Sequence, residues 1–126
     1  MSSRPLVAIV DDDESLRDAT SNLLQAAGFS TATFADAETF LRSGGPRAAC
    51  VVADMRMPGM SGLELHQHLA ASGVAIETVL ITAYASEATR TRACAAGIVC
   101  CLAKPFAPDE LLECVRGALA RATPKS

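Results

Sequence analysis

Aromatic residues are scarce in this sequence of 126 residues, which has no tryptophan, one tyrosine and four phenylalanines. Half of the residues are nevertheless hydrophobic. The core must therefore be built mainly from Ala, Val, Leu and Ile. A chain of this length forms one domain and can bury a sizeable core.

Positive charge is also in short supply, since the formal net charge is −3 at pH 7. No basic segment would attract nucleic acid or a membrane surface, and we expect no direct binding to either. No apolar run approaches the roughly 18 residues of a membrane span. The five apolar residues 6–10 are followed at once by acids, which is not typical of a signal peptide. The sequence therefore predicts a cytoplasmic protein.

The cysteines and histidines lack the spacing that is typical of a metal site. His66 and His68 are two residues apart, so they face different sides of a helix, and we expect both to be exposed or at the rim of the surface. The five cysteines are odd in number and follow neither a CxxC nor a Cys/His pattern. They are interpreted as small buried hydrophobic residues: Cys50, Cys94, Cys100, Cys101 and Cys114.

Short apolar runs alternate with amphipathic segments along the whole chain. Strands are predicted at residues 6–10, 30–34, 50–53, 78–81 and 98–102. Helices are predicted at 14–27, after a cap at Asp36, after a capping box at Ser61, and at 86–96 and 108–120. Continuous apolar strands are typical of a parallel sheet covered on both faces. The sequence therefore predicts an α/β doubly wound fold, a five-stranded parallel sheet in the flavodoxin-like order 2-1-3-4-5.

Polar side chains follow the predicted strands at their carboxyl ends, where ligands bind in such folds. Asp11 and Asp12 follow the first strand, Asp54 the third, Thr82 the fourth and Lys104 the fifth. Two carboxylates about 4 Å apart repel by about 4 kcal/mol at an effective dielectric constant near 20. Such a cluster must take up protons or bind a divalent cation. Its oxygen ligands suit Mg²⁺, and Mn²⁺ could substitute.

These residues define a minimal site for phosphoryl transfer. A carboxylate beside Mg²⁺ can attack phosphorus in line, while Lys104 neutralises charge on the phosphoryl oxygens. The hydroxyl group of Thr82 can hydrogen-bond the transferred group. The sequence has neither a Walker loop nor a kinase glycine-rich loop. The phosphoryl group is therefore expected to come from another molecule.

Four segments, VAIVDDDE, VVADMRMPGMSG, VLITAY and CLAKPF, occur in this order. Together they resemble the receiver domains of bacterial two-component response regulators, in the CheY-like superfamily and its FixJ-type receivers. The resemblance covers essentially the whole chain. It implies a receiver domain at 1–122 and a polar tail or the start of a linker at 123–126. It also implies a phosphorylation-dependent switch that catalyses only its own phosphorylation and slow dephosphorylation.

The resemblance assigns roles to the acidic residues. Asp54 would be the phosphoacceptor, and the phosphoryl donor would be a phosphohistidine on a sensor histidine kinase. Asp11, Asp12 and Asp54 would bind Mg²⁺ together with the backbone carbonyl of Arg56. Of Asp11 and Asp12, the resemblance favours Asp12 as the direct ligand. An Asp-nucleophile phosphatase is a less favoured alternative, because it needs an acid where this chain has Arg56.

The resemblance also assigns the coupling residues. Thr82 would be the switch hydroxyl group and Lys104 the phosphate-pairing cation, with a cis peptide bond before Pro105 aiming the lysine. Receivers usually carry Tyr or Phe where this chain has Cys101. We hypothesise that Tyr84 replaces that ring as the moving aromatic element.

Further expectations follow for regulation and partners. Arg56 and Tyr84 would shield the acyl phosphate from water, so dephosphorylation should take minutes or longer. The adjacent residues Cys100 and Cys101 suggest redox sensitivity as a second hypothesis. The last two helices and the fifth strand could form a homodimer, and a DNA-binding output domain would lie outside this chain. A degenerate receiver that binds partners constitutively is the remaining alternative.

Overall fold

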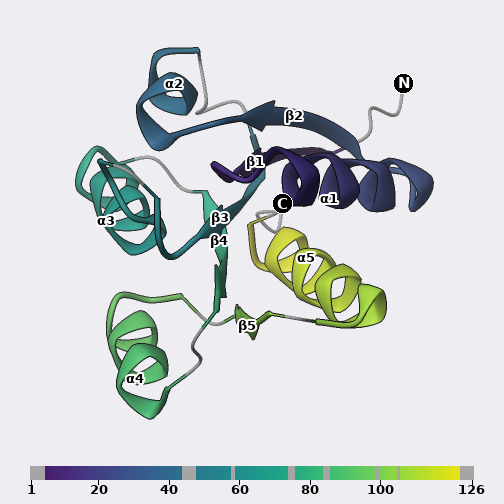
Figure 1. Ribbon diagram of the computed structural model, residues 1–126. Coiled ribbons are helices and arrows are strands. Elements are labelled where there is room, and N and C mark those ends of the chain that lie inside the picture. Colours follow the sequence, from purple (N-terminus) through teal and green to yellow (C-terminus); the bar gives the residue numbers. More distant parts are fainter. Residues whose placement is uncertain are drawn as a thin grey trace.

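The computed structural model describes residues 5–43, 48–57, 59–73, 76–83, 86–98, 100–104 and 106–122. Strands and helices alternate strictly along these residues, as Figure 1 shows. The strands are β1 (Leu6–Val10), β2 (Ser30–Phe34), β3 (Cys50–Asp54), β4 (Glu77–Thr82) and β5 (Cys100–Ala103). The helices are α1 (Glu14–Ala26), α2 (Ala37–Arg42), α3 (Gly62–Ala71), α4 (Glu87–Ala95) and α5 (Pro108–Ala122).

The five strands form one parallel sheet in the order β2-β1-β3-β4-β5. The predicted doubly wound fold and its strand order are therefore confirmed. The central strand β3 is buried at all five of its residues. Its continuous apolar sequence follows from this position, because side chains on both faces of the strand meet a helix.

Helices cover both faces of the sheet (Figure 1). Helices α1 and α5 lie on one face, where Val52 and Val7 join Leu24 and Val115 in one apolar cluster. Helices α2, α3 and α4 lie on the other face, where Val51 packs in a second cluster with residues of α2 and α3. Consecutive residues of the same strand, such as Val51 and Val52, thus enter opposite layers, as the period of two requires.

The start of α3 is fixed by the predicted capping box. The hydroxyl group of Ser61 accepts a hydrogen bond from the Glu64 backbone N–H at 3.1 Å, and Glu64 Oε1 accepts one from the Ser61 N–H at 2.9 Å. This reciprocal cap begins the helix a few residues after the carboxyl end of β3. It therefore anchors the loop that leads away from Asp54.

The fifth strand begins later than predicted, at Cys100 rather than at residue 98. Gly97 has a φ of +91°, and the Ile98 N–H donates to the Ala93 carbonyl at 2.9 Å. Ile98 therefore completes the turn that ends α4, a role typical of the residue after a left-handed glycine. Its apolar side chain is buried, which explains why it resembles a strand residue in the sequence.

The histidines lie as expected, whereas the expectation for the cysteines needs correction. His66 is half-buried, as a rim position allows, with Nδ1 2.9 Å from Thr78 Oγ1 and Nε2 2.8 Å from the Ala96 carbonyl oxygen. His68 is exposed, as expected. Of the five cysteines only Cys50 is buried, and the others lie at or near the surface. Among the helices of the described ranges, none has both the length and the apolar character to cross a membrane.

Candidate functional site

Three carboxylates gather where β1 and β3 end. Asp11 follows β1 directly and Asp54 is the last residue of β3, and these two strands are hydrogen-bonded neighbours. One carboxylate oxygen from each of Asp11, Asp12 and Asp54 lies within 4.8 Å of the others. Asp11 and Asp54 are only 3% and 6% exposed, whereas Asp12 is exposed. The cluster that the sequence predicts is therefore assembled, with one member open to solvent.

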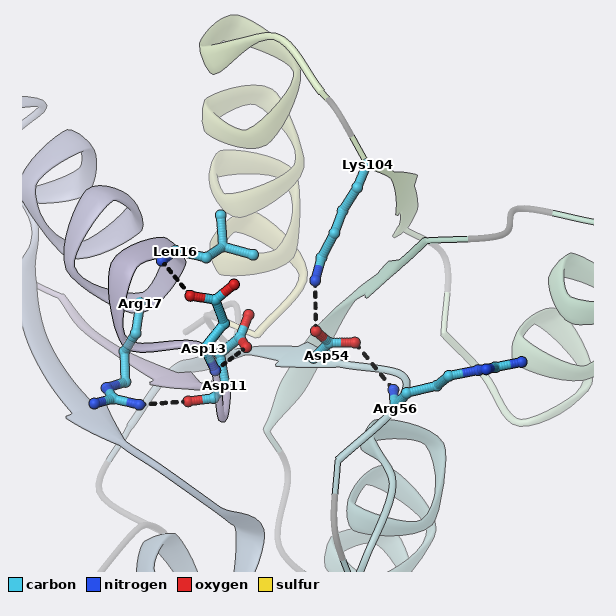
Figure 2. Close-up of polar contacts among 7 residues, drawn as sticks. All are labelled: Asp11, Asp13, Leu16, Arg17, Asp54, Arg56 and Lys104. Atoms are coloured by element: carbon cyan, nitrogen blue, oxygen red, sulfur yellow. Dashed lines mark hydrogen bonds and ion pairs between the residues drawn. The ribbon is translucent and has the colours of Figure 1, made fainter.

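The loop after β1 is held by its own polar contacts (Figure 2). Asp11 Oδ1 accepts a hydrogen bond from the Asp13 N–H at 2.9 Å. Asp13 Oδ1 accepts one from the Leu16 N–H at 3.2 Å and so caps α1. Arg17 Nη1 donates to the Asp11 carbonyl oxygen at 2.7 Å. The sequence does not identify Arg17 as a site residue, because Arg17 lies six positions after Asp11 and its side chain reaches back from the helix.

Asp54 is engaged through both of its carboxylate oxygens (Figure 2). Lys104 Nζ lies 2.6 Å from Oδ2, and the Arg56 N–H donates to Oδ1 at 3.0 Å. The backbone N–H of Lys104 donates to the Thr82 carbonyl at 2.8 Å, which fixes the lysine beside the end of β4. Partial burial acts to lower the pKa of Lys104, but the hydrogen bond and charge of Asp54 outweigh it and raise that pKa. Lys104 therefore remains charged.

The acidic cluster retains excess negative charge. Burial raises the pKa of Asp11 above its usual value of 3.8, and the nearby charge of Asp54 raises it further, while the Asp13 N–H acts in the opposite direction. Oxygen ligands of this kind, buried on one side and open on the other, fit a hard divalent cation such as Mg²⁺ or Mn²⁺. The three carboxylates could therefore hold such an ion.

Replacing Asp11 with asparagine should stabilise the metal-free protein. The amide oxygen can still accept the Asp13 N–H, while the repulsion by Asp54 is removed. We expect the free energy of unfolding at pH 7 to rise by about 1 kcal/mol, which is an ordinary size for one substitution. The folded-state pKa of Asp11 is raised, so wild-type stability falls as pH rises through that pKa. The advantage of the variant should therefore shrink as pH is lowered toward 3.8.

Urea denaturation in a chelator, repeated from pH 4 to pH 8, would measure this difference. Asp12→Asn is the matched control, because its exposed side chain is screened by water and its removal should change stability less. A variant at Asp11 that is no more stable than the wild type at pH 7 would contradict this electrostatic explanation.

The structure also places other residues that the sequence predicts for the site. Thr82 is the last residue of β4, is 3% exposed, and lies one position past Ile81, the register partner of Asp54. Thr82 and Arg56 line a cavity of about 680 Å³ between α3 and α4. Cys101 is half-buried on β5 and packs with the cluster that contains Leu80 and Ile98, away from the carboxylates. Tyr84 and Pro105 fall outside the described residues.

A second contact that the sequence did not reveal involves Gly62, the first residue of α3. A Cβ atom at this position would lie 2.5 Å from the Asp54 carbonyl oxygen and 2.7 Å from Leu80 Cδ1. The helix therefore approaches the backbone of the strand end more closely than a residue with a side chain allows. The signal that could have identified this position is a glycine at a helix start, where it is not required for capping.

The fold and the acidic strand ends together define a class of protein. The family model for the response regulator receiver domain matches residues 7–116. The chain therefore belongs to the response regulator receiver family.

Individual relatives show how much of each protein the chain represents. It is 34% identical over 125 residues to the transcriptional regulatory protein FixJ of Bradyrhizobium diazoefficiens, covering 98% of this chain and 61% of that protein. The solved structure of the response regulator StyR is 43% identical with a TM-score of 0.87, covering 95% of this chain and 61% of that one. A structure of FixJ-N is 31% identical with a TM-score of 0.86, covering 99% and 100%. The chain thus spans about three fifths of the length of FixJ.

Proposed function

We propose that this chain is a phosphorylation-dependent signalling switch in which Asp54 accepts a phosphoryl group. The observation that carries this proposal is the setting of the Asp54 carboxylate. It is buried, it pairs with Lys104 at 2.6 Å, and it lies among carboxylates that can hold a divalent cation. A nucleophile, a cation for the phosphoryl oxygens and a metal-binding group therefore share one end of the sheet.

The residues of the chain would act as follows. An oxygen of Asp54 attacks phosphorus, and the bond from phosphorus to the leaving group breaks, which is an imidazole nitrogen if the donor is a phosphohistidine. The ammonium group of Lys104 then pairs with the phosphoryl oxygens in place of Asp54 Oδ2. Thr82 is the proposed switch residue, and its hydroxyl group would hydrogen-bond the transferred phosphoryl group.

Asp11, Asp12, Asp54 and the backbone carbonyl of Arg56 are the ligands that we propose for Mg²⁺ or Mn²⁺. When bound, the ion supplies positive charge that stabilises the transferring phosphoryl group. The donor set consists only of oxygen atoms, which suits this role. Zinc, which prefers nitrogen and sulfur ligands, fits it less well.

The experiment that tests this proposal uses a small phosphodonor. The wild-type chain is incubated with acetyl phosphate, once with Mg²⁺ and once with a chelator, and its intact mass is followed. We expect the mass of one phosphoryl group to be gained with Mg²⁺ and little or no gain in the chelator. Peptide mapping should locate the group on Asp54. An unchanged mass in Mg²⁺, or a gain at another residue, would overturn the proposal.

Phosphorylation would shift a conformational equilibrium that other proteins detect. We propose a sensor histidine kinase as the phosphoryl donor and a cytoplasmic location for the reaction. The surface of α4, β5 and α5 is the proposed output and dimer surface, with Cys101 in place of the usual ring and Tyr84 as the moving aromatic residue. We also propose that dephosphorylation is slow, because Arg56 and Tyr84 would shield the acyl phosphate from water.

The proposed domain boundary is residue 122. The family match ends at residue 116 and α5 continues to Ala122, whereas residues 123–126 lie outside the described part of the chain. Because the chain spans about three fifths of FixJ, an output domain such as a DNA-binding module would be carried by a longer protein or by a partner. Arg56 still disfavours the phosphatase alternative, because its guanidinium group cannot act as a general acid.

A further inference from the structure

Four of the five cysteines lie together at one edge of the sheet. Cys94 comes from α4, Cys100 and Cys101 from the edge strand β5, and Cys114 from α5. They line one cavity of about 330 Å³. Cys94 is exposed and the other three are half-buried, so solutes can reach this region. Figure 1 shows β5 at the end of the sheet, with α4 and α5 on its two sides.

Within this group, Cys100 and Cys114 form a pair on one face of the sheet. Both pack against the same apolar cluster, the one covered by α1 and α5. Both also line a second cavity of about 320 Å³, which opens beside Glu110 and Glu113. The Cys100 thiol also lies near enough to act on Cys114, because it raises the pKa of the Cys114 thiol. Two cysteines on different elements therefore share the same two cavities.

Cys101 is turned away from this pair although it is adjacent in sequence. It packs with Leu80 and Ile98 on the opposite face of the sheet, as the alternation of side chains along a strand requires. The structure therefore points away from redox chemistry between the adjacent residues 100 and 101. The partner of Cys100 is instead Cys114, which is fourteen positions later in the sequence.

We propose that Cys100 and Cys114 form a redox-active dithiol, which a low-molecular-weight disulfide such as glutathione disulfide converts into a disulfide bond between β5 and α5. A metal site is a poorer fit to the same pair. Among the described residues, the only group of three or more potential ligands within 4.8 Å of one another is the acidic cluster of Asp11, Asp12 and Asp54. A structural zinc ion would require four ligands.

The reaction balances in two exchange steps. The Cys100 sulfur attacks the oxidant disulfide, forms a mixed disulfide and releases one thiol from the oxidant. The Cys114 sulfur then attacks the mixed disulfide, forms the bond to Cys100 and releases the second thiol, while the two protein thiol protons go to the released thiolates or to water. The protein loses two electrons and two protons, and the oxidant gains two electrons.

The surroundings of Cys114 determine how readily its thiol group attacks a disulfide. Burial raises the pKa of the Cys114 thiol to about 12, and the neighbouring Cys100 thiol and the nearby charges of Glu110 and Glu113 contribute to this. Because the thiolate is the attacking species, attack by Cys114 is slow at neutral pH. The second step is intramolecular, and the shared cavities give Cys114 and Cys100 a high effective concentration there. The reaction should be slow at neutral pH and faster as pH rises.

The bond would join the edge strand to α5, on the surface that we propose as the output surface. It would close a loop of about 15 residues and thereby restrict the unfolded chain. The oxidised protein should therefore unfold at a higher urea concentration than the reduced protein. Addition of a reductant should restore the original midpoint. This reaction does not involve Asp54, so it can succeed or fail independently of the proposed phosphorylation.

The test treats the reduced chain with glutathione disulfide and follows intact mass at several pH values. We expect the mass to fall by two hydrogen atoms, more quickly as pH rises, with peptides containing Cys100 and Cys114 joined. Cys100→Ser and Cys114→Ser should each abolish this change. Cys94→Ser and Cys101→Ser are matched controls, because these residues line the same cavity and should still allow the bond to form.

Three outcomes would overturn the proposal. One is a wild-type protein whose thiols remain free, and another is a mixed disulfide with glutathione that persists without resolution. The third is a bond that survives in Cys114→Ser or disappears in Cys101→Ser, since either result would identify a different pair. If Cys114→Ser does not fold, peptide mapping of the oxidised wild-type chain and of Cys101→Ser identifies the linkage without that variant.

Discussion

Asp54→Asn should abolish phosphoryl transfer to this chain while preserving its fold. The amide group has no oxygen that can act as a carboxylate nucleophile, although it keeps the size and one acceptor of the original side chain. The Arg56 N–H, which donates to Asp54 Oδ1 at 3.0 Å, can still be satisfied by the amide oxygen. We expect the rate of phosphorylation by acetyl phosphate in Mg²⁺ to fall by at least about 10³-fold, as for loss of other enzymatic nucleophiles.

The matched control is Asp13→Asn, a second change from acid to amide in the same region. Asp13 caps α1 by accepting the Leu16 N–H, and asparagine is an equally good cap. This variant should therefore gain the phosphoryl mass at a rate close to that of the wild type. Continued phosphorylation of Asp54→Asn, with the group mapped elsewhere, would show that Asp54 is not the acceptor. Equal loss in both variants would indicate a general electrostatic effect instead.

The sheet could be predicted because its strands have a recognisable pattern in the sequence. Buried parallel strands appear as continuous apolar runs, and the acidic residues that end β1 and β3 interrupt those runs abruptly. Once the strand order is assumed, adjacent strand ends must share one edge of the sheet. Asp11, Asp12, Asp54 and Lys104 therefore come together for topological reasons, without knowledge of any side-chain conformation.

The remaining contacts depend on three-dimensional details that no sequence period encodes. Arg17 lies on an amphipathic helix and gives no sign that its guanidinium group returns to the Asp11 carbonyl oxygen. The placement of Cys100 and Cys114 on the same two cavities depends on how α5 is rotated against β5. The sequence predicts Ile98 to be a strand residue because a buried apolar side chain after a glycine looks the same in a turn.

Gly62→Ala should both destabilise the protein and impair phosphorylation. The added Cβ would lie 2.5 Å from the Asp54 carbonyl oxygen and 3.0 Å from its carbonyl carbon, and backbone atoms cannot move aside as a flexible side chain can. Alanine is the better helix former by about 1 kcal/mol in a helix interior. Overpacking a tight site costs about 1–3 kcal/mol, and the clash is with backbone, so we expect a net loss of about 2 kcal/mol.

Ser61→Ala separates this effect from a simple weakening of α3. It removes the hydroxyl group that caps the helix and should cost about 1 kcal/mol, but it adds no atom beside Asp54. Urea denaturation would measure both losses, and intact mass after treatment with acetyl phosphate and Mg²⁺ would measure phosphorylation. Only Gly62→Ala should slow phosphorylation, because only that change displaces the peptide that carries the acceptor. If Gly62→Ala were as stable as the wild type, the close approach of α3 to β3 could not be what positions Asp54.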